Sequence, residues 1–361
     1  MKAFECDHCG NLVFFDNTKC LKCGHPLGFQ PDALDLTALN AKSDATGQLF
    51  SGITGDKLYR LCKNGQDYGV CNWLVQIPDT NELCVACRLN ETIPNLSVPG
   101  NLELWGRWER AKHHAVYTLL QLGLPLEGDA EKNQPGLHFR FLADSPGAEP
   151  VLTGHLSGTI TLNIAEGDDV EREKRRVNLH EPYRTLVGHF RHEVGHYYWD
   201  RLVWGTPRLE RFRALFGDET KDYGEALKIY YAKGPPQDWQ DHFVTAYATA
   251  HPWEDWAESW AHYLHIVDTI ETANSFGMSL RPRHPSARTM TFEFNQVTPF
   301  HTDFERIVKN WIPLTYALNS LNRGMGLHDL YPFVLSTPAL DKLGFIHQII
   351  RDIEEGKTAG S

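Results

Sequence analysis

Five consecutive residues near the middle of the chain have types and spacing that can perform hydrolysis. Residues 192–196 read His-Glu-Val-Gly-His. On a helix, positions i and i+4 lie on one face about one turn apart, so the imidazoles of His192 and His196 can bind one zinc ion. Zinc lowers the pKa of a bound water toward about 7. Glu193 lies beside this water, so we expect it to act as the general base.

This chemistry requires a third protein ligand and one coordination position left open for water. The segment 251–265 reads HPWEDWAESWAHYLH and is typical of a helix. Glu254 and Glu258 are four residues apart and therefore share one face of it. An alternative for Glu254 is a purely helix-stabilising carboxylate, because it falls in the first turn.

Other polar side chains are candidates for assisting roles. His189 shares a helical face with the two motif histidines and can contact a ligand or the substrate. It is disfavoured as the third ligand, because three ligands on one straight helix would span too far. His262 continues the stripe of the two glutamates and can polarise a substrate carbonyl. Four tyrosines compete with it for this oxyanion-stabilising role and equally suit core packing: Tyr183, Tyr197, Tyr198 and Tyr263.

All eight cysteines precede residue 88, and clustered pairs of this kind favour metal over disulfides. The first group consists of two pairs with a two-residue gap: Cys6, Cys9, Cys20 and Cys23. The gap lets both sulfurs of a pair reach one ion, and glycine after each pair suits the tight turn that follows. We therefore predict a structural zinc site of the zinc-ribbon kind, with His8 and His25 as alternatives for one ligand.

A second group of cysteines follows: Cys62, Cys71, Cys84 and Cys87. Only its last pair has the two-residue gap, so its pattern is less specific. One shared zinc ion is favoured over four free thiols. With the histidine site, the sequence predicts three zinc ions per chain, two of them structural.

Three stretches of the sequence resemble a known family. They read TGHLSGTITLNIAEGDD (153–169), EPYRTLVGHFRHEVGHYYWDRL (181–202) and HPWEDWAESWAHYLHIVDT (251–269). With the cysteine-rich front, the chain resembles bacterial zinc-binding metallopeptidases that carry an N-terminal zinc-ribbon region.

The resemblance implies a zincin-like peptidase whose third ligand is a glutamate. The family pattern places the zinc on His192, His196 and Glu254, with Glu193 as the catalytic residue. In glutamate-ligand zincins an acidic residue four positions later hydrogen-bonds the first histidine, which points to Glu258. Exchange of the two glutamate roles, or ligation by Asp255, remains an alternative.

The elements that would position these residues give an α+β fold class, mostly helical with a small sheet. Alternation predicts strands over 137–142 and 158–165, and a charged turn follows over 168–176. The second strand precedes the motif helix, the order in which zincins present an edge strand beside the metal for a substrate peptide. Apolar periodicity predicts seven helices: 104–122, 182–203, 219–232, 238–250, 253–272, 302–322 and 339–354.

Four regions follow from these assignments. We expect a zinc ribbon over 1–29, a polar linker over 30–57 and a second four-cysteine module over 58–99. The zincin-like metallopeptidase domain would then cover 100–361, although no motif is assignable after residue 274.

Composition excludes several other classes of protein. Of 361 residues, 42% are hydrophobic and 22% charged, as in a folded protein. No run of about 18 apolar residues could span a membrane, and the start lacks the apolar stretch of a secretory signal. We therefore expect a cytoplasmic protein. The net charge of −11 makes nucleic acid a poorer partner for the ribbon than another protein.

The leading hypothesis is a zinc peptidase that acts on peptide or protein substrates. Two alternatives use the same residues. One is a zinc-stabilised protein-binding module without turnover, and the other is a metal-dependent amidase acting on a non-protein substrate.

Overall fold

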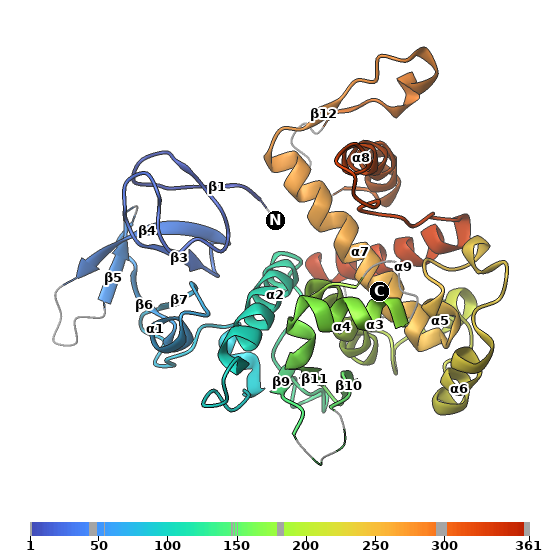
Figure 1. The fold of residues 1–361 in the computed structure, drawn as a ribbon, viewed down its shortest axis with the longest axis horizontal. Helices are drawn as coiled ribbons and strands as arrows, with labels where there is room; N and C mark the ends of the chain where they lie inside the picture. The colour runs from blue at the N-terminus through green and yellow to red at the C-terminus, as the bar shows by residue number, and fades with distance from the viewer. Residues whose placement is uncertain are drawn as a thin grey trace. The chain divides into compact units, whose positions relative to one another are not determined.

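The computed structural model describes residues 2–42, 49–53, 55–145, 147, 149, 151–178, 184–293 and 302–356 (Figure 1). The chain forms two compact units. The first contains Ala3–Gln121 and Pro125–Phe190, and the second contains Leu122–Leu124 and Arg191–Ser361. Strands dominate the beginning of the chain and helices its remainder, so the predicted α+β class is confirmed.

The first unit begins with two antiparallel sheets. A small hairpin pairs β1 (Phe4–Glu5) with β2 (Leu12–Val13). The larger sheet has the order β3-β4-β5-β6-β7. Its strands are β3 (Leu27–Gln30), β4 (Asp35–Lys42), β5 (Leu49–Gly52), β6 (Leu58–Leu61) and β7 (Leu74–Gln76). The short helix α1 (Lys63–Tyr68) connects β6 to β7.

The prediction of a linker over residues 30–57 is wrong, because β4 and β5 lie within this range. The apolar side chains of Leu36, Ala38 and Leu39 are buried. Each strand pairs with its neighbours in the sheet, which satisfies backbone groups that a linker would leave to water. The polar composition of the segment concealed these few buried positions.

An aromatic core joins this sheet to helix α2 (Asn101–Gln121). The rings of Phe15 and Phe29 are 4.9 Å apart, and Phe29 lies 4.6 Å from Trp73. Tyr117 of α2 lies 5.4 Å from Phe15. All four side chains are buried, so the cysteine-rich segment and α2 share one apolar core.

The first unit also contains a four-stranded sheet of order β10-β11-β9-β8. The strands are β8 (Asn90–Thr92), β9 (His138–Leu142), β10 (Gly154–Leu156) and β11 (Thr159–Asn163). The expectation that the alternating strand lies at an edge is wrong, because β11 lies between β9 and β10. Ser157 and Gly158 have φ of 49° and 84°, which turns the chain back so that β10 covers that edge.

A helix replaces the predicted charged turn. After the 3₁₀ turn Ile164–Gly167, α3 covers Asp169–Asn178. The side chain of Asp168 accepts hydrogen bonds from the N–H groups of Val170 and Glu171, at 2.9 and 3.0 Å. This capping starts a helix whose charged residues conceal it from an apolar-periodicity analysis.

The second unit is mainly helical (Figure 1). Helix α4 (Leu186–Leu202) begins in the first unit, and the division between units falls after Phe190. The others are α5 (Arg208–Phe216), α6 (Tyr223–Lys233), α7 (Pro252–Ser275), α8 (Phe304–Gly324) and α9 (Thr337–Glu354). The short strands β12 (Ser279–Leu280) and β13 (Phe292–Glu293) pair.

The prediction of a helix over residues 238–250 is wrong. Only two 3₁₀ turns, Trp239–Asp241 and Tyr247–Thr249, form there.

Among the described residues, no helix is both long enough and apolar enough to cross a bilayer.

Helix α7 packs against α5, α8 and α9 in the second unit. His251 caps its first turn by accepting a hydrogen bond from the N–H of Trp253 at 3.1 Å, and Pro252 occupies the first helical position. Lys342 of α9 forms a buried ion pair of 2.6 Å with Asp255. Helix α7 is therefore held at its N-terminal end, where the glutamates of interest lie.

Candidate metal centres

Helix α4 carries the two motif histidines. Its first turn is capped by Thr185, whose hydroxyl oxygen accepts a hydrogen bond from the N–H of Gly188 at 3.0 Å. The helix therefore begins about one turn later than predicted, and the first two residues of the predicted helix, 182 and 183, lie outside the described residues. His192 and His196 lie one turn apart, with their Nε2 atoms separated by 3.2 Å.

A glycine allows α4 to approach α7. A Cβ atom at Gly195 would lie only 3.0 Å from the Cα of Ala257 and 3.2 Å from the Cβ of Trp260. The indole N–H of Trp256 also donates a hydrogen bond of 2.8 Å to the carbonyl oxygen of Gly195. This close approach brings the motif histidines beside the first turn of α7.

Donor atoms of three residues meet there at the spacing of zinc ligands. The Nε2 of His192 lies 3.0 Å from Oε2 of Glu254, and the Nε2 of His196 lies 3.6 Å from Oε1 of the same carboxylate. Tetrahedral ligands about 2.05 Å from a zinc ion are about 3.3 Å apart. With the 3.2 Å between the two nitrogens, all three separations are close to this value, so the donor set fits a zinc ion.

Carboxylates surround the first histidine on two sides. Nδ1 of His192 donates a hydrogen bond of 2.6 Å to Oε1 of Glu258, which directs Nε2 toward Glu254. Burial lowers the pKa of His192, but its hydrogen bonds to the two glutamates outweigh this and raise the pKa well above its ordinary value. Burial raises the pKa of Glu254, but the effect of the two imidazoles is larger. The pKa of this carboxyl is therefore held well below its usual range.

A tyrosine that the sequence analysis did not single out contacts the same carboxylate. The hydroxyl of Tyr223, at the start of α6, donates a hydrogen bond of 2.6 Å to Oε1 of Glu254. Glu254 is 1% exposed, whereas Tyr223 is 37% exposed. No spacing rule connects a tyrosine on one helix with a glutamate on another, so the sequence contained no signal for this contact.

Glu193 is 9% exposed and follows His192 directly on α4. Asp255, the alternative ligand, is held in its ion pair with Lys342. The structure thus brings Glu254 to the histidines and directs Asp255 to α9.

The other predicted candidates have different partners. His189 lies 3.3 Å from Glu166, and Nδ1 of His262 lies 2.8 Å from the hydroxyl of Tyr331. The tyrosine candidates are similarly engaged: Tyr197 with Arg201 at 2.6 Å, Tyr263 with His347 at 2.9 Å, and Tyr198 stacked on Trp260. Tyr183 lies outside the described residues.

The first four-cysteine cluster comprises Cys6, Cys9, Cys20 and Cys23. Its sulfurs lie 3.8 Å apart for Cys6 and Cys23 and 3.7 Å apart for Cys9 and Cys20. Tetrahedral sulfurs about 2.3 Å from a zinc ion are about 3.8 Å apart. Gly10 and Gly24, which follow the two pairs, have φ of 70° and 79°, as the tight turn requires.

The alternative ligands of this cluster also lie close to it. The rings of His8 and His25 stack at 3.7 Å, and their donor atoms gather with Cys23. The four sulfurs nevertheless all lie within 4.8 Å of one another, so they can supply four ligands without either imidazole.

The second four-cysteine cluster comprises Cys62, Cys71, Cys84 and Cys87. The sulfurs of Cys71 and Cys84 are 3.7 Å apart, again the spacing expected around zinc. Backbone N–H groups point at the sulfurs, as those of Trp73 and Cys84 do at 3.3 and 3.4 Å. The set is therefore closed by four sulfurs and lined by hydrogen-bond donors.

Comparison with known families agrees with this chemistry. Residues 101–349 match the family described as "Putative zinc-binding metallo-peptidase". The chain belongs to this family. Residues 3–98 match a zinc-ribbon domain, so the resemblance noted from the sequence is confirmed. The metallopeptidase match begins at the first residue of α2 and includes α4 and α7, which carry the histidines and Glu254.

Proteins with sequences similar to this chain occur in mycobacteria. Proteins of Mycobacterium bovis and of Mycobacterium tuberculosis strain H37Rv are each 42% identical to this chain over 354 residues. The aligned residues cover 98% of this chain and 96% of each relative, and both relatives bear the name "Uncharacterized protein". No solved structure matches the chain.

Proposed function

We propose that the protein is a zinc-dependent peptidase whose catalytic zinc is held by His192, His196 and Glu254. The observation that carries the proposal is the convergence of these three side chains, whose nearest donor atoms lie 3.0 to 3.6 Å apart. Three protein ligands leave one coordination position for water, as catalytic zinc sites require.

Zinc bound there would lower the pKa of a water molecule and polarise the scissile carbonyl. Glu193 accepts the proton of the attacking water and later donates it to the leaving amine nitrogen. Glu258 fixes the ring of His192 through the 2.6 Å hydrogen bond, and Tyr223 fixes the carboxylate of Glu254.

The two four-cysteine clusters would hold structural zinc, which makes three ions per chain. Both have four sulfurs and no position for water, so they suit a structural rather than a hydrolytic role. The proposed domain arrangement has a cysteine-rich segment up to residue 99 and a metallopeptidase domain from residue 100. The proposed substrate of this domain is a peptide or a protein.

The test compares the wild-type chain with Glu193→Gln, which keeps the shape of the side chain and removes its basicity. A peptide library is digested and read by mass spectrometry, and zinc content is measured on the same samples. We expect the variant to retain three zinc ions and to lose about 10²- to 10⁴-fold in cleavage rate. Glu210→Gln, an exposed position on α5, is the matched control and should cleave normally.

Two results would contradict this assignment. Cleavage by Glu193→Gln at the wild-type rate would exclude Glu193 as the base. A wild-type chain with three zinc ions that cleaves no peptide would favour the alternatives, a protein-binding module or an amidase for a non-protein substrate.

A further inference from the structure

We infer that helix α2 is an integral part of the second four-cysteine cluster, where the His113 ring contacts two of the cluster's sulfurs and holds them in place. The ribbon match ends at residue 98, whereas α2 belongs to the metallopeptidase match. A residue within the metallopeptidase match would therefore help to retain the zinc of the second four-cysteine cluster, whose cysteines lie within the zinc-ribbon match. The inference does not depend on hydrolysis at the histidine site.

The first observation is the position of the His113 ring. Its Nε2 lies 3.3 Å from the sulfur of Cys71 and 3.6 Å from that of Cys87. Its Nδ1 donates a hydrogen bond of 2.6 Å to the carbonyl oxygen of Glu109, one turn earlier on α2. His113 is 3% exposed, so this bond fixes the ring with its other nitrogen directed at two sulfurs.

His113 is a neighbour of the closed sulfur set rather than one of its ligands. The donor atoms of the four cysteines all lie within 4.8 Å of one another, and His113 groups only with Cys87 and Glu109. A side chain that contacts zinc thiolates from outside the ligand set acts as ligand-orienting residues do in other zinc sites, by holding the ligand in place.

The second observation is a buried ion pair on the same face of α2. Lys112 and Glu109 are each 0% exposed, and the lysine Nζ lies 2.8 and 2.9 Å from the two carboxylate oxygens. Nζ also donates to Oδ1 of Asn90 at 2.5 Å, and the sulfur of Cys87 lies 3.6 Å from Glu109. The pair therefore links α2 directly to a cysteine and to β8.

Charge explains why a lysine is buried at this place. A zinc ion with four thiolates carries a net charge of about −2. The carboxylate of Glu109 beside this cluster would be repelled by that negative charge. Burial lowers the pKa of Lys112, but the charges of Glu109 and Cys87 outweigh it and raise the pKa above its ordinary value. The ammonium thus offsets negative charge that would otherwise be unpaired in the interior.

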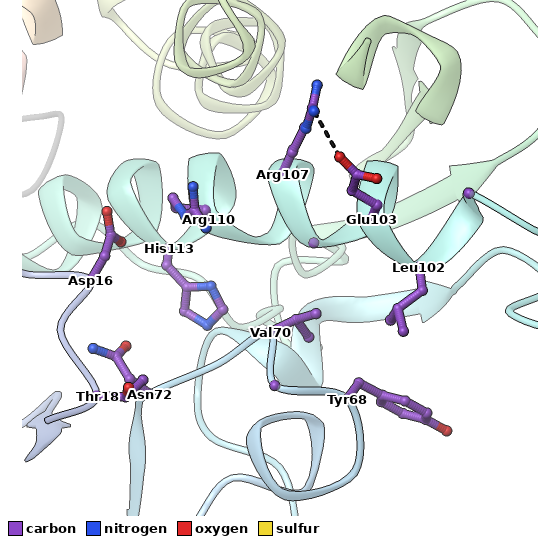
Figure 2. A pocket seen from close by; sticks show the side chains of 13 residues that line it. Asp16, Thr18, Tyr68, Val70, Asn72, Leu102, Glu103, Arg107, Arg110 and His113 are labelled. Atoms are coloured by element: carbon purple, nitrogen blue, oxygen red, sulfur yellow. Dashed lines mark hydrogen bonds and ion pairs between the residues drawn. The ribbon is translucent and has the colours of Figure 1, made fainter. Parts of the chain in front are cut away.

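His113 also lines a cavity of about 660 Å³ (Figure 2). Its lining includes Val70 and Asn72 from the cysteine-rich segment and Arg107 and Arg110 from α2. Figure 2 shows the His113 ring extending from α2 toward the Val70 and Asn72 side of this cavity. Since the same ring contacts Cys71, its removal would open the cavity onto the cluster.

The test uses the full-length, zinc-loaded chain with His113→Ala and the matched control His114→Ala. His114 is the next residue, but it pairs with Asp16 at 3.3 Å and is partly exposed. Zinc transfer to a chromogenic chelator is followed with time, and alkylation of each cysteine by iodoacetamide is mapped by mass spectrometry. We expect His113→Ala to release one zinc about 10- to 100-fold faster, with Cys71 alkylated first.

A third variant separates the polar contact from the volume of the side chain. His113→Gln retains a polar side chain that can reach the sulfurs, so it should release zinc more slowly than His113→Ala. Equal release by His113→Ala and His114→Ala would overturn the inference. Loss of zinc by the glutamine variant to the same extent as by the alanine variant would also overturn it, because the polar contact with the sulfurs would then have no role.

Discussion

The second four-cysteine cluster and the histidine site differ in how completely protein atoms surround the expected ion. The cluster has four sulfurs, with Cys62, Cys84 and Cys87 buried. The histidine site has two nitrogens and one carboxylate. A closed sulfur set suits a zinc that stabilises the fold, and a three-donor set suits one that meets a substrate.

The two sites also differ in what orients their ligands. Backbone N–H groups and His113 face the sulfurs, whereas the carboxylate of Glu258 and the hydroxyl of Tyr223 contact the ligands of the histidine site. Main-chain donors move only if the fold moves. Side-chain partners can be changed one at a time, which makes the histidine site easier to adjust without unfolding the chain.

The largest expected effect is loss of structure when the closed site is broken. Cys84→Ser should lose one of the three zinc ions and unfold the segment around the second cluster, since structural zinc contributes on the order of 10 kcal/mol to folding. Hydrogen exchange should show lost protection in α2. The conservative surface change Ser97→Ala is the control, and a Cys84→Ser protein with three zinc ions and a protected α2 would contradict the comparison.

An intermediate effect should follow from brief treatment with 1,10-phenanthroline. The open position of the histidine site lets the chelator approach, so this zinc should leave first and peptide cleavage should cease. The circular dichroism spectrum should remain unchanged, and added zinc should restore cleavage. Earlier release from a cysteine cluster, detected by alkylation of its thiols, would reverse the proposed difference between the sites.

The smallest expected effect concerns the partner of Glu254. Tyr223→Phe removes the hydroxyl that holds this carboxylate, and loss of such a partner typically weakens metal affinity about 10- to 100-fold. Competition with a fluorescent zinc chelator measures the change. Tyr231→Phe, on the same helix and 61% exposed, is the control. Equal affinity of the two variants would show that the contact with Glu254 does not support the zinc.

Several features could be predicted from local sequence patterns because they depend on neighbouring residues. The helical period explains why His192 and His196 face the same way, and their nitrogens lie 3.2 Å apart. The cysteine pairs followed by glycine gave the turns that the structure contains. Helix α7 was also predictable, because its capping residue, its proline and its apolar period agree.

Elements with few apolar residues were predicted wrongly from the sequence. The charged helix α3 was taken for a turn and the strands β4 and β5 for a linker. In both cases capping or strand pairing stabilises the element, and these interactions leave little trace in hydropathy.

The sequence alone therefore determined the donor types, their local spacing and the kind of chemistry they suit. Only the tertiary structure decided that Glu254 rather than Asp255 faces the histidines, and that Tyr223 and His113 contact the two sites. The reason is physical: spacing along one helix follows from backbone geometry, whereas contacts between helices depend on close packing, as at Gly195.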